Sequence, residues 1–232
     1  MQSSSDSPRC FGPGSDIADA DPKLLVATLN DSHILVIGKF CVIGPHLLLL
    51  TKDSYRRQRK SLDADDLAAA YSVITTLNPQ HFAFYNCGLA AGASRQHKHI
   101  QILPRPGPMF PDKPDFDRSM IPFRFFLRYL EDVDQKPGQL AHIYSELLAQ
   151  ARVVLNIPND EDCPHNMVLV REWILVIPRR SNDFNGVTAN SAGMMGYVWL
   201  GKSEELDRWK RVGPVLALAG LGIPSGTVVD IQ

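Results

Sequence analysis

The sequence predicts an α+β fold in which flanking helices cover an antiparallel sheet. Short apolar runs occur in pairs separated by a turn, over residues 33–51 and 166–177, which is typical of antiparallel hairpins. Residues 62–77 and 140–155 carry apolar side chains at helical spacing. Hairpins with interspersed helices are the pattern expected of an α+β domain.

The overall composition excludes several classes of protein. The chain has 232 residues, of which 44% are hydrophobic and 21% charged, and its net charge is −1. This balance gives no general attraction to nucleic acid or to a membrane surface, so an anionic ligand has to be held by local chemistry. No apolar run approaches the ~20 residues that span a bilayer. Four widely spaced cysteines without a Cys-x-x-Cys pair argue against a zinc ribbon or disulfide framework. We expect a cytoplasmic protein that could also enter the nucleus.

The N-terminal half begins with a polar stretch. Residues 1–20 are rich in Ser, Asp, Gly and Pro, and we expect a flexible tail there. Strands are expected at 33–37 and 46–51, joined by a turn at Gly44-Pro45. Lys39 and Lys52 lie at or just past the ends of apolar runs, where each could reach a cleft or simply face water.

A capped helix follows this hairpin. It is expected over 62–77, with Ser61 or Asp63 as its N-cap and Asn78-Pro79 as its stop. The aspartates of its first turn complement the helix dipole, so we interpret them as structural rather than as metal ligands.

The middle of the chain alternates regular and irregular segments. A buried strand at 82–85 leads through Asn86 into a small-residue loop at 87–96. Residues 104–122 contain six prolines among nineteen residues, which predicts a long irregular excursion. Residues 123–130 are aromatic-rich, and we expect a helix there before the clearer helix at 140–155.

The C-terminal part completes the same fold. Strands are expected at 166–170 and 173–177, the second ended by Pro178. A small-residue segment at 190–196 precedes an apolar strand at 197–200, and a final helix covers 214–221.

Strict alternation after the small-residue loop singles out a chemical site. His97, His99 and Gln101 fall on one face of a strand, with Lys98, Ile100 and Ile102 on the other. Neutral imidazole is a good nucleophile near neutral pH and can attack phosphorus. The backbone N–H groups of Gly92, Ala93 and Ser94, with the Ser94 hydroxyl, could hold the phosphate oxygens.

The spacing favours His99 as the nucleophile, because it lies deeper along the strand and beside Gln101. His97 would then support it or act on the side of the leaving group. An amide at the third position cannot act as a general acid, which makes transfer to an anionic acceptor more plausible than hydrolysis.

Two alternatives remain at this point. The histidines could be partly buried residues on a sheet face that have no catalytic role. They could also bind zinc, but the other histidines show no recognisable ligand spacing. We expect no protein-bound metal site.

Three motifs in order resemble those of one enzyme family. They are Asn86-Cys-Gly with Gly92-Ala-Ser94 and His97-Lys-His-Ile-Gln101, the hairpin of residues 39–52, and residues 164–179 with Asn190-Ser-Ala-Gly193. Together they resemble the diadenosine tetraphosphate phosphorylases, also called ATP adenylyltransferases, of the histidine-triad/galactose-1-phosphate uridylyltransferase superfamily. The resemblance implies a nucleotidyltransferase core over 21–160 and a C-terminal adenylyltransferase segment over 161–232 that completes the same fold.

The resemblance also implies a reaction and its partners. His99 would attack the α-phosphate of a dinucleoside polyphosphate, release ATP and carry AMP, which inorganic phosphate then takes to give ADP. A divalent cation, Mg²⁺ or Mn²⁺, would enter with the polyphosphate. A related donor such as adenylyl sulfate, hydrolysis, or nucleotide binding without turnover are the alternatives.

By similarity, the ligand-contacting residues come from both parts of the chain. They would be Gly38, Lys39, Lys52, Asn86, Gly92, Ala93, Ser94, Arg95, Gln101, Asn190, Ser191, Ala192, Tyr197 and Lys202.

The chain departs from the family pattern in three places. By this comparison it starts inside the fold, without a basic upstream segment, so we expect the sheet to lack an edge and the site a phosphate contact. Arg95-Gln96 replaces the more usual glutamine followed by proline or an acidic residue, and Lys202 falls one residue late after Asn190.

Overall fold

The computed structural model describes residues 12–17, 22–39, 41, 44–77, 80–131 and 138–226. Within these residues the chain forms an eight-stranded sheet in the order β1-β2-β3-β5-β4-β7-β8-β6, and every pair of neighbours is antiparallel. The antiparallel α+β prediction is therefore confirmed. The strands are β1 Leu25–Leu29, β2 His33–Ile37, β3 Leu47–Thr51, β4 His81–Cys87, β5 His99–Pro104, β6 Phe126–Tyr129, β7 His165–Leu169 and β8 Trp173–Pro178.

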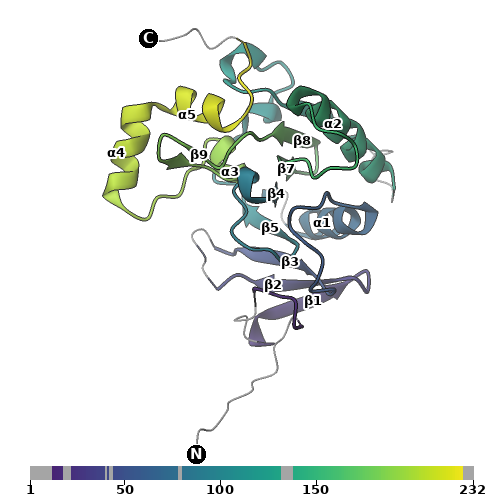
Figure 1. Cartoon of the computed structure of the whole chain (residues 1–232). Coiled ribbons are helices and arrows are strands. Elements are labelled where there is room, and N and C mark those ends of the chain that lie inside the picture. The colour runs from purple at the N-terminus through teal and green to yellow at the C-terminus, as the bar shows by residue number, and fades with distance from the viewer. Residues whose placement is uncertain are drawn as a thin grey trace, which may run out of the picture.

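Helices lie on both sides of this sheet (Figure 1). Helices α1 (Ala64–Thr76) and α2 (Gln139–Leu155) cover one side. On the other side lie α3 (Ser191–Met194), α4 (Ser203–Val212), α5 (Pro214–Leu221) and a small hairpin of β9 (Asp183–Phe184) and β10 (Val187–Thr188). Short 3₁₀ turns are formed by Pro22–Leu24, Leu89–Ala91, Phe110–Asp112 and Arg118–Met120.

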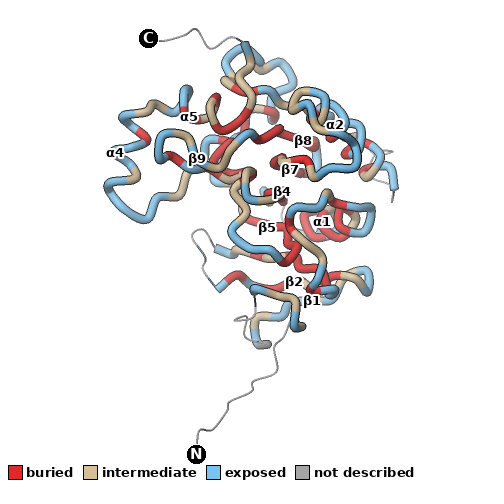
Figure 2. The backbone as a smooth tube through the Cα atoms, in the orientation of Figure 1, coloured by how far each residue is buried: buried red, intermediate tan, exposed pale blue. Residues whose placement is uncertain are grey.

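Two hydrophobic cores follow from the alternation of the strands. Residues such as Leu49, Ile100 and Tyr85 pack beneath α1 and α2. Phe84 and Leu103 face the opposite side and pack with the α3–α5 region. Figure 2 shows that β4, β7 and β8 are buried along most of their length, whereas α4 is largely exposed.

The second core does not extend over the N-terminal strands. There only a small cluster around Val36 and Leu50 is formed on that face. The face of β5 that carries His99 and Gln101 therefore lies between a covered and an open part of the sheet, which leaves room for a site.

Several local expectations were wrong. Residues 126–129 form strand β6 rather than helix, because Phe126 packs into the core under α2 while Leu127 packs into the opposite core. Residues 197–200 are not a strand, and they follow helix α3 as an irregular segment. The expected helix stop at Asn78-Pro79 lies outside the described residues.

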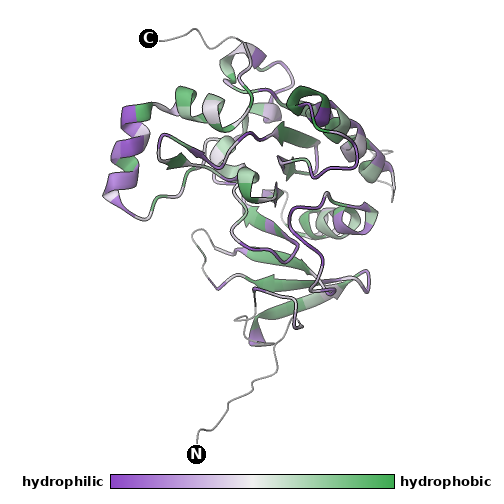
Figure 3. Cartoon of the chain, in the orientation of Figure 1, coloured by the Kyte–Doolittle hydropathy of each residue, from purple (hydrophilic) through white to green (hydrophobic). Residues whose placement is uncertain are grey.

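Four features were not anticipated: β1, the β9–β10 hairpin, the short helix α3 and helix α4. Helix α4 is strongly hydrophilic (Figure 3) and buries only Trp209, so few apolar residues mark it in the sequence. No helix among the described residues is both long and apolar enough to cross a membrane.

Candidate functional site

The site is built where β4 leads into β5 through the small-residue loop. Strands β4 and β5 are paired, with Phe84 opposite Gln101, so the loop returns the chain beside its own starting strand. Gly92 has φ of +84°, and a Cβ there would lie 2.9 Å from the Ala189 carbonyl oxygen. Glycine permits this close approach, which joins the loop to the segment that precedes α3.

His99 has a defined tautomer. Its Nδ1 lies 2.9 Å from the carbonyl oxygen of His97, and because that oxygen can only accept, Nδ1 carries the hydrogen. Nε2 is therefore left with its lone pair. Burial lowers the pKa of His99 to about 4, so the ring is neutral at physiological pH. Such an imidazole is ready to act as a nucleophile.

The main chain of His99 is held by a side chain that sequence reasoning missed. Gln58 is buried, and its Oε1 accepts from the His99 N–H at 2.7 Å while its Nε2 donates to the His99 carbonyl at 3.0 Å. The same Nε2 donates to the Asn86 carbonyl at 3.1 Å. Gln58 thus joins the end of β4 to the start of β5. A lone glutamine in a polar loop carries no sequence signal for this role.

His97 is fully buried and both of its ring nitrogens are engaged. Nε2 lies 2.8 Å from the carbonyl oxygen of Thr51, so Nε2 carries the hydrogen, and Nδ1 accepts from the Ser15 hydroxyl at 2.8 Å. The ring lines neither cavity described below. Its position is that of a supporting residue, whose carbonyl orients the ring of His99.

Part of the expected tail contacts this histidine strand. Besides the Ser15 contact, the Asp16 carboxylate accepts from the N–H of Gln96 at 2.6 Å and of His97 at 3.0 Å. These hydrogen bonds help to lower the pKa of Asp16 against the opposing effect of burial. The expectation of a flexible tail is therefore wrong for residues 12–17, while residues 1–11 and 18–20 lie outside the described part.

Two adjacent cavities meet at Ser94 and Gln101. The histidine cavity has a volume of about 220 Å³, and besides these two residues it is lined by Asp16, Ile17, Val36, Ile37, Gly38, Lys39, His46, Leu48, Arg95 and His99. The Asn190 cavity has a volume of about 510 Å³ and is lined in addition by Gly92, Ala93, Asn182, Thr188, Ala189, Asn190, Gly193, Tyr197, Val198 and Trp199. Both volumes are of the order that small ligands occupy.

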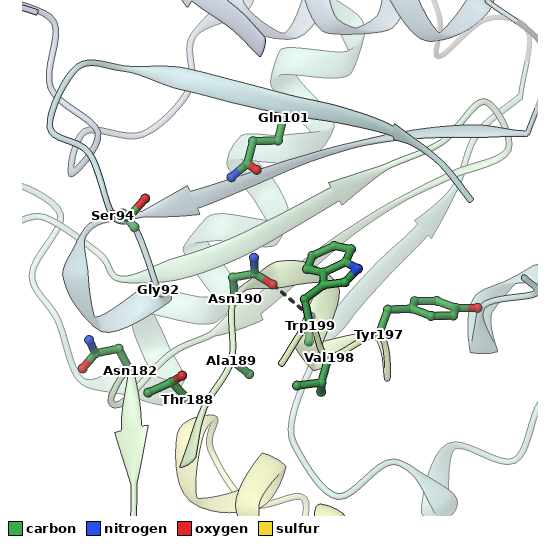
Figure 4. Close-up of a pocket in the computed structure, with 12 residues that line it drawn as sticks. Gly92, Ser94, Gln101, Asn182, Thr188, Ala189, Asn190, Tyr197, Val198 and Trp199 are labelled. Carbon is green, nitrogen blue, oxygen red and sulfur yellow. Dashed lines mark hydrogen bonds between the residues drawn. The ribbon is translucent and has the colours of Figure 1, made fainter. Parts of the chain in front are cut away.

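Figure 4 shows the arrangement of the Asn190 cavity. Gln101 enters from β5 and Ser94 from the loop, while Asn190 and Trp199 come from the C-terminal part of the chain. The Asn190 side chain also caps α3 by accepting from the Gly193 N–H at 3.0 Å. Trp199 was not anticipated, because its segment was expected to form a strand.

Three residues expected to contact ligand, Asn86, Ser191 and Ala192, are buried instead. The Oδ1 atom of Asn86 accepts from the Ser191 hydroxyl at 2.6 Å and from Asn166 Nδ2 at 3.0 Å. Ser191 and Ala192 are completely buried in α3, and none of the three lines either cavity. The geometry makes Asn86 a link between β4, β7 and α3.

The buried Arg179 extends this network. Its guanidinium donates to Asn166 Oδ1 at 2.5 Å and to the carbonyl oxygens of Ser181 and Ala189 at 2.8 and 2.9 Å. A planar group with five donors can satisfy several carbonyls that the irregular chain leaves unpaired. Through Ala189, Arg179 holds the floor of the Asn190 cavity.

The expected lysines and tyrosine lie at different places. Lys39 lines the histidine cavity, whereas Lys52 is exposed and lines neither cavity. Tyr197 lines the Asn190 cavity and donates its hydroxyl to the Pro108 carbonyl at 2.9 Å. Lys202 is the exposed N-cap of α4 and also lies outside both cavities.

Behind the histidine strand lies a buried cluster of charges. Lys98 Nζ contacts Asp66 Oδ2 at 2.6 Å, and His33 Nε2 contacts Asp66 Oδ1 at 2.9 Å. Arg56 reaches the same carboxylate at 3.1 Å. Burial would raise the pKa of Asp66, but these partners lower it well below its usual value. The structural interpretation of this aspartate agrees with the contacts, which anchor α1 to β5.

Among the residues that the structure describes, no three His, Cys, Asp or Glu side chains gather in a way that could hold a metal ion. The thiol of Cys87, the last residue of β4, is buried, which raises its pKa to about 12, so it is protonated and unreactive at neutral pH.

Family models match almost the whole described chain. Residues 17–117 match the Ap4A phosphorylase N-terminal domain, and residues 119–224 match the ATP adenylyltransferase C-terminal domain. Two Saccharomyces cerevisiae proteins are similar in sequence. Protein APA1 is 30% identical over 207 residues, and diadenosine 5',5'''-P1,P4-tetraphosphate phosphorylase 2 is 29% identical over 227 residues. These alignments cover 76% and 82% of this chain and 64% and 70% of the yeast proteins.

Solved structures give the same relationship. Yeast Ap4A phosphorylase Apa2 in complex with Ap4A has a TM-score of 0.76 at 25% identity, over 93% of this chain and 82% of that chain. Its complex with AMP has a TM-score of 0.76 at 26% identity, over 89% and 79% of the two chains.

Proposed function

The chain belongs to the family of Ap4A phosphorylases, or ATP adenylyltransferases, and on that premise we propose that it cleaves diadenosine tetraphosphate by phosphorolysis. The products are ATP and ADP. The observation that carries the proposal is the geometry of His99, a buried neutral imidazole whose Nδ1 is tied to the His97 carbonyl and whose ring lines a cavity.

The reaction has two displacement steps. His99 Nε2 attacks the phosphorus of one AMP group, and the bond from that phosphorus to the bridging oxygen breaks, so the electron pair leaves with ATP. The ring then carries AMP and a positive charge, which the Nδ1–H···O=C bond to His97 stabilises. An oxygen of inorganic phosphate attacks the same phosphorus, the N–P bond breaks and ADP leaves, which restores the lone pair on Nε2.

The residues around His99 fit the needs of this transfer. Ser94 and Gln101 line both cavities, so they can bind the phosphate groups that pass between them. The apolar lining of the histidine cavity, with Lys39 at its side, suits one nucleotide, and the larger Asn190 cavity with its aromatic residues suits the other. Gln101 cannot protonate a leaving group, which favours an anionic acceptor over water.

A divalent cation, Mg²⁺ or Mn²⁺, would neutralise polyphosphate charge and would enter with the substrate. Asp16 is the carboxylate that lines the histidine cavity, and one carboxylate plus substrate oxygens is a donor set that suits Mg²⁺. We also propose a cytoplasmic setting, in keeping with the free thiols of the buried Cys87 and Cys163.

Product analysis of the purified chain tests this function. Incubation with diadenosine tetraphosphate, inorganic phosphate and Mg²⁺ should give ATP and ADP in equal amounts. ATP plus AMP would identify a hydrolase, and turnover of adenylyl sulfate in preference would identify a different donor. Binding of nucleotide without any product, in the presence of each donor, would contradict enzymatic function.

A further inference from the structure

Helix α4 lies at the periphery of the molecule, away from the histidine strand (Figure 1). Its side chains Glu204, Asp207, Arg208 and Arg211 are all exposed, and none of them lines the histidine or the Asn190 cavity. Their spacing of i, i+3, i+4 and i+7 places the four on one face of the helix. Trp209 is buried on the other side and packs into the second core. We call the four residues the charged face of α4.

The charges of this face are not neutralised within the chain. Glu204 and Arg208 are four positions apart, as are Asp207 and Arg211, a spacing at which ion pairs can form along a helix. The structure forms neither pair, and none of the four belongs to an ion pair among the residues it describes. Arg208 Nε donates a long hydrogen bond, 3.5 Å, to the Glu204 carbonyl, which leaves the guanidinium charge in place.

The order of the charges along α4 is self-complementary. The two acidic residues come first and the two arginines follow, at equal distances on either side of the midpoint between Asp207 and Arg208. If two copies pack their α4 helices antiparallel about a two-fold axis at that midpoint, Glu204 faces the partner's Arg211 and Asp207 faces the partner's Arg208. The two-fold repeats both contacts, so four intermolecular ion pairs result.

The surroundings of α4 add apolar surface to this face. Leu200, shortly before the helix, is 37% exposed, and Val215 and Leu216, shortly after it, are 56% and 44% exposed. Antiparallel packing brings the start of one helix beside the end of the other, so these apolar residues approach each other across the axis. This matters because exposed ion pairs contribute little affinity alone, whereas burial of apolar surface drives association.

A hollow next to the arginines gives the partner's side chains room. It has a volume of about 430 Å³ and is lined by Asn185, Arg208, Arg211, Val212 and Leu216. The Arg208 side chain lies over the turn between β9 and β10, where a Cβ at Gly186 would be 3.3 Å from its Cδ. In the antiparallel arrangement the partner's acidic residues face this hollow.

We propose that the charged face of α4 is a self-association surface, on which a second copy of this chain docks with its own α4 antiparallel. An acidic or a basic partner would match only half of the face, because it carries two charges of each sign, whereas a second copy matches all four. A helix of ten residues is about 15 Å long, so the contact is small. We therefore expect a weak dimer, with a Kd on the order of 100 µM.

Charge reversal on each half of the face tests the proposal. Arg208→Glu with Arg211→Glu makes the face acidic throughout, and Glu204→Arg with Asp207→Arg makes it basic throughout. Each double variant should dimerise at least about 10-fold more weakly than the unaltered chain, because like charges then meet at the axis. An equimolar mixture of the two should form a heterodimer at least as tight as the unaltered dimer.

Lys210→Glu is the matched control. Lys210 is exposed on the same helix but lies two positions from Arg208, so it does not share the charged face. Its Kd should stay within about 2-fold of that of the unaltered chain. Thermal unfolding of every variant checks that the fold is kept.

Sedimentation equilibrium of the purified chain over a range of concentrations provides the measurement. Raising NaCl from about 50 to about 500 mM should weaken dimerisation of the unaltered chain about 5-fold, a readout that needs no variant. A monomer at every concentration up to about 500 µM overturns the proposal and leaves the face to a different protein. Dimers that persist in both double variants, or a mixture that associates no better than its components, would place self-association on another surface.

Discussion

The Gln58 side chain hydrogen-bonds to both main-chain polar groups of His99, accepting from its N–H at 2.7 Å and donating to its carbonyl at 3.0 Å. This side chain comes from a loop 41 residues earlier in the sequence. It fixes the start of β5, and with it the direction in which the imidazole enters the histidine cavity. Gln58 is thus a positioning residue, which acts through His99.

Gln58→Leu should keep the side-chain volume and remove both hydrogen bonds to the His99 main chain. We expect kcat to fall about 10- to 100-fold, because a shift of about 1 Å at a nucleophile has an effect of that order. The KM for the dinucleotide should change little. Steady-state kinetics beside thermal unfolding checks this, with Gln150→Leu on the exposed face of α2 as control. Equal kcat in the two variants would remove the positioning role.

His99→Ala should abolish turnover, with a loss of at least about 10³-fold, because no other side chain can carry AMP in its place. Mass spectrometry after incubation with diadenosine tetraphosphate should show an AMP adduct on the unaltered chain and none on the variant. His142→Ala, at an exposed position on α2, is the control for histidine removal. An adduct that persists in the H99A variant and disappears in His97→Ala would reverse the assignment.

The pH dependence follows from the lowered pKa of His99. The folded ring takes up a proton only near pH 4, so the nucleophilic form persists well below the ordinary histidine pKa of about 6.5. The ATP burst rate should therefore stay level as pH falls from 8 to 5. Rapid-quench measurements, with circular dichroism at each pH, check this expectation. A fall centred near pH 6.5 would show that the ring is not desolvated.

The buried cluster around Asp66 should matter for stability. Asp66→Asn leaves Lys98 and His33 without their carboxylate, and breaking a buried pair costs about 3–5 kcal/mol of unfolding free energy. Asp65→Asn, at the exposed neighbouring position in the same helical turn, should change the free energy of unfolding by less than about 0.5 kcal/mol. Urea unfolding of both variants provides the comparison, and equal midpoints would contradict the anchoring role.

Gly92→Ala should disturb the Asn190 cavity from the loop side. A methyl group there meets the Ala189 carbonyl oxygen at 2.9 Å and the Asn190 Cα at 3.0 Å, in addition to the cost of φ at +84°. We expect a several-fold rise in the KM for the dinucleotide. Gly213→Ala is the matched control, since its φ is +82° but nothing lies within 4 Å of its Cβ. If both variants lower stability equally and leave KM unchanged, backbone strain alone explains the effect.

The sequence by itself determined the elements whose signal is local. The short apolar run at 33–37 and the final helix expected at 214–221 correspond to β2 and α5, with the bounds that the structure has. The period of two over 97–103 placed His99 and Gln101 on one face, and both line the histidine cavity. Such patterns depend only on the backbone geometry of a few neighbouring residues, so they can be read without knowledge of the rest of the chain.

Only the tertiary structure decided which side chains support the site and which line it. Asn86 looked like a ligand residue, yet its oxygen accepts from Ser191, 105 positions away. Ser15 and Asp16 looked like part of a tail, yet they hold His97 and its peptide across more than 80 positions. A hydrogen bond of this kind exists only once the sheet has brought distant segments together, because polar side chains carry no periodic signal that names their partner.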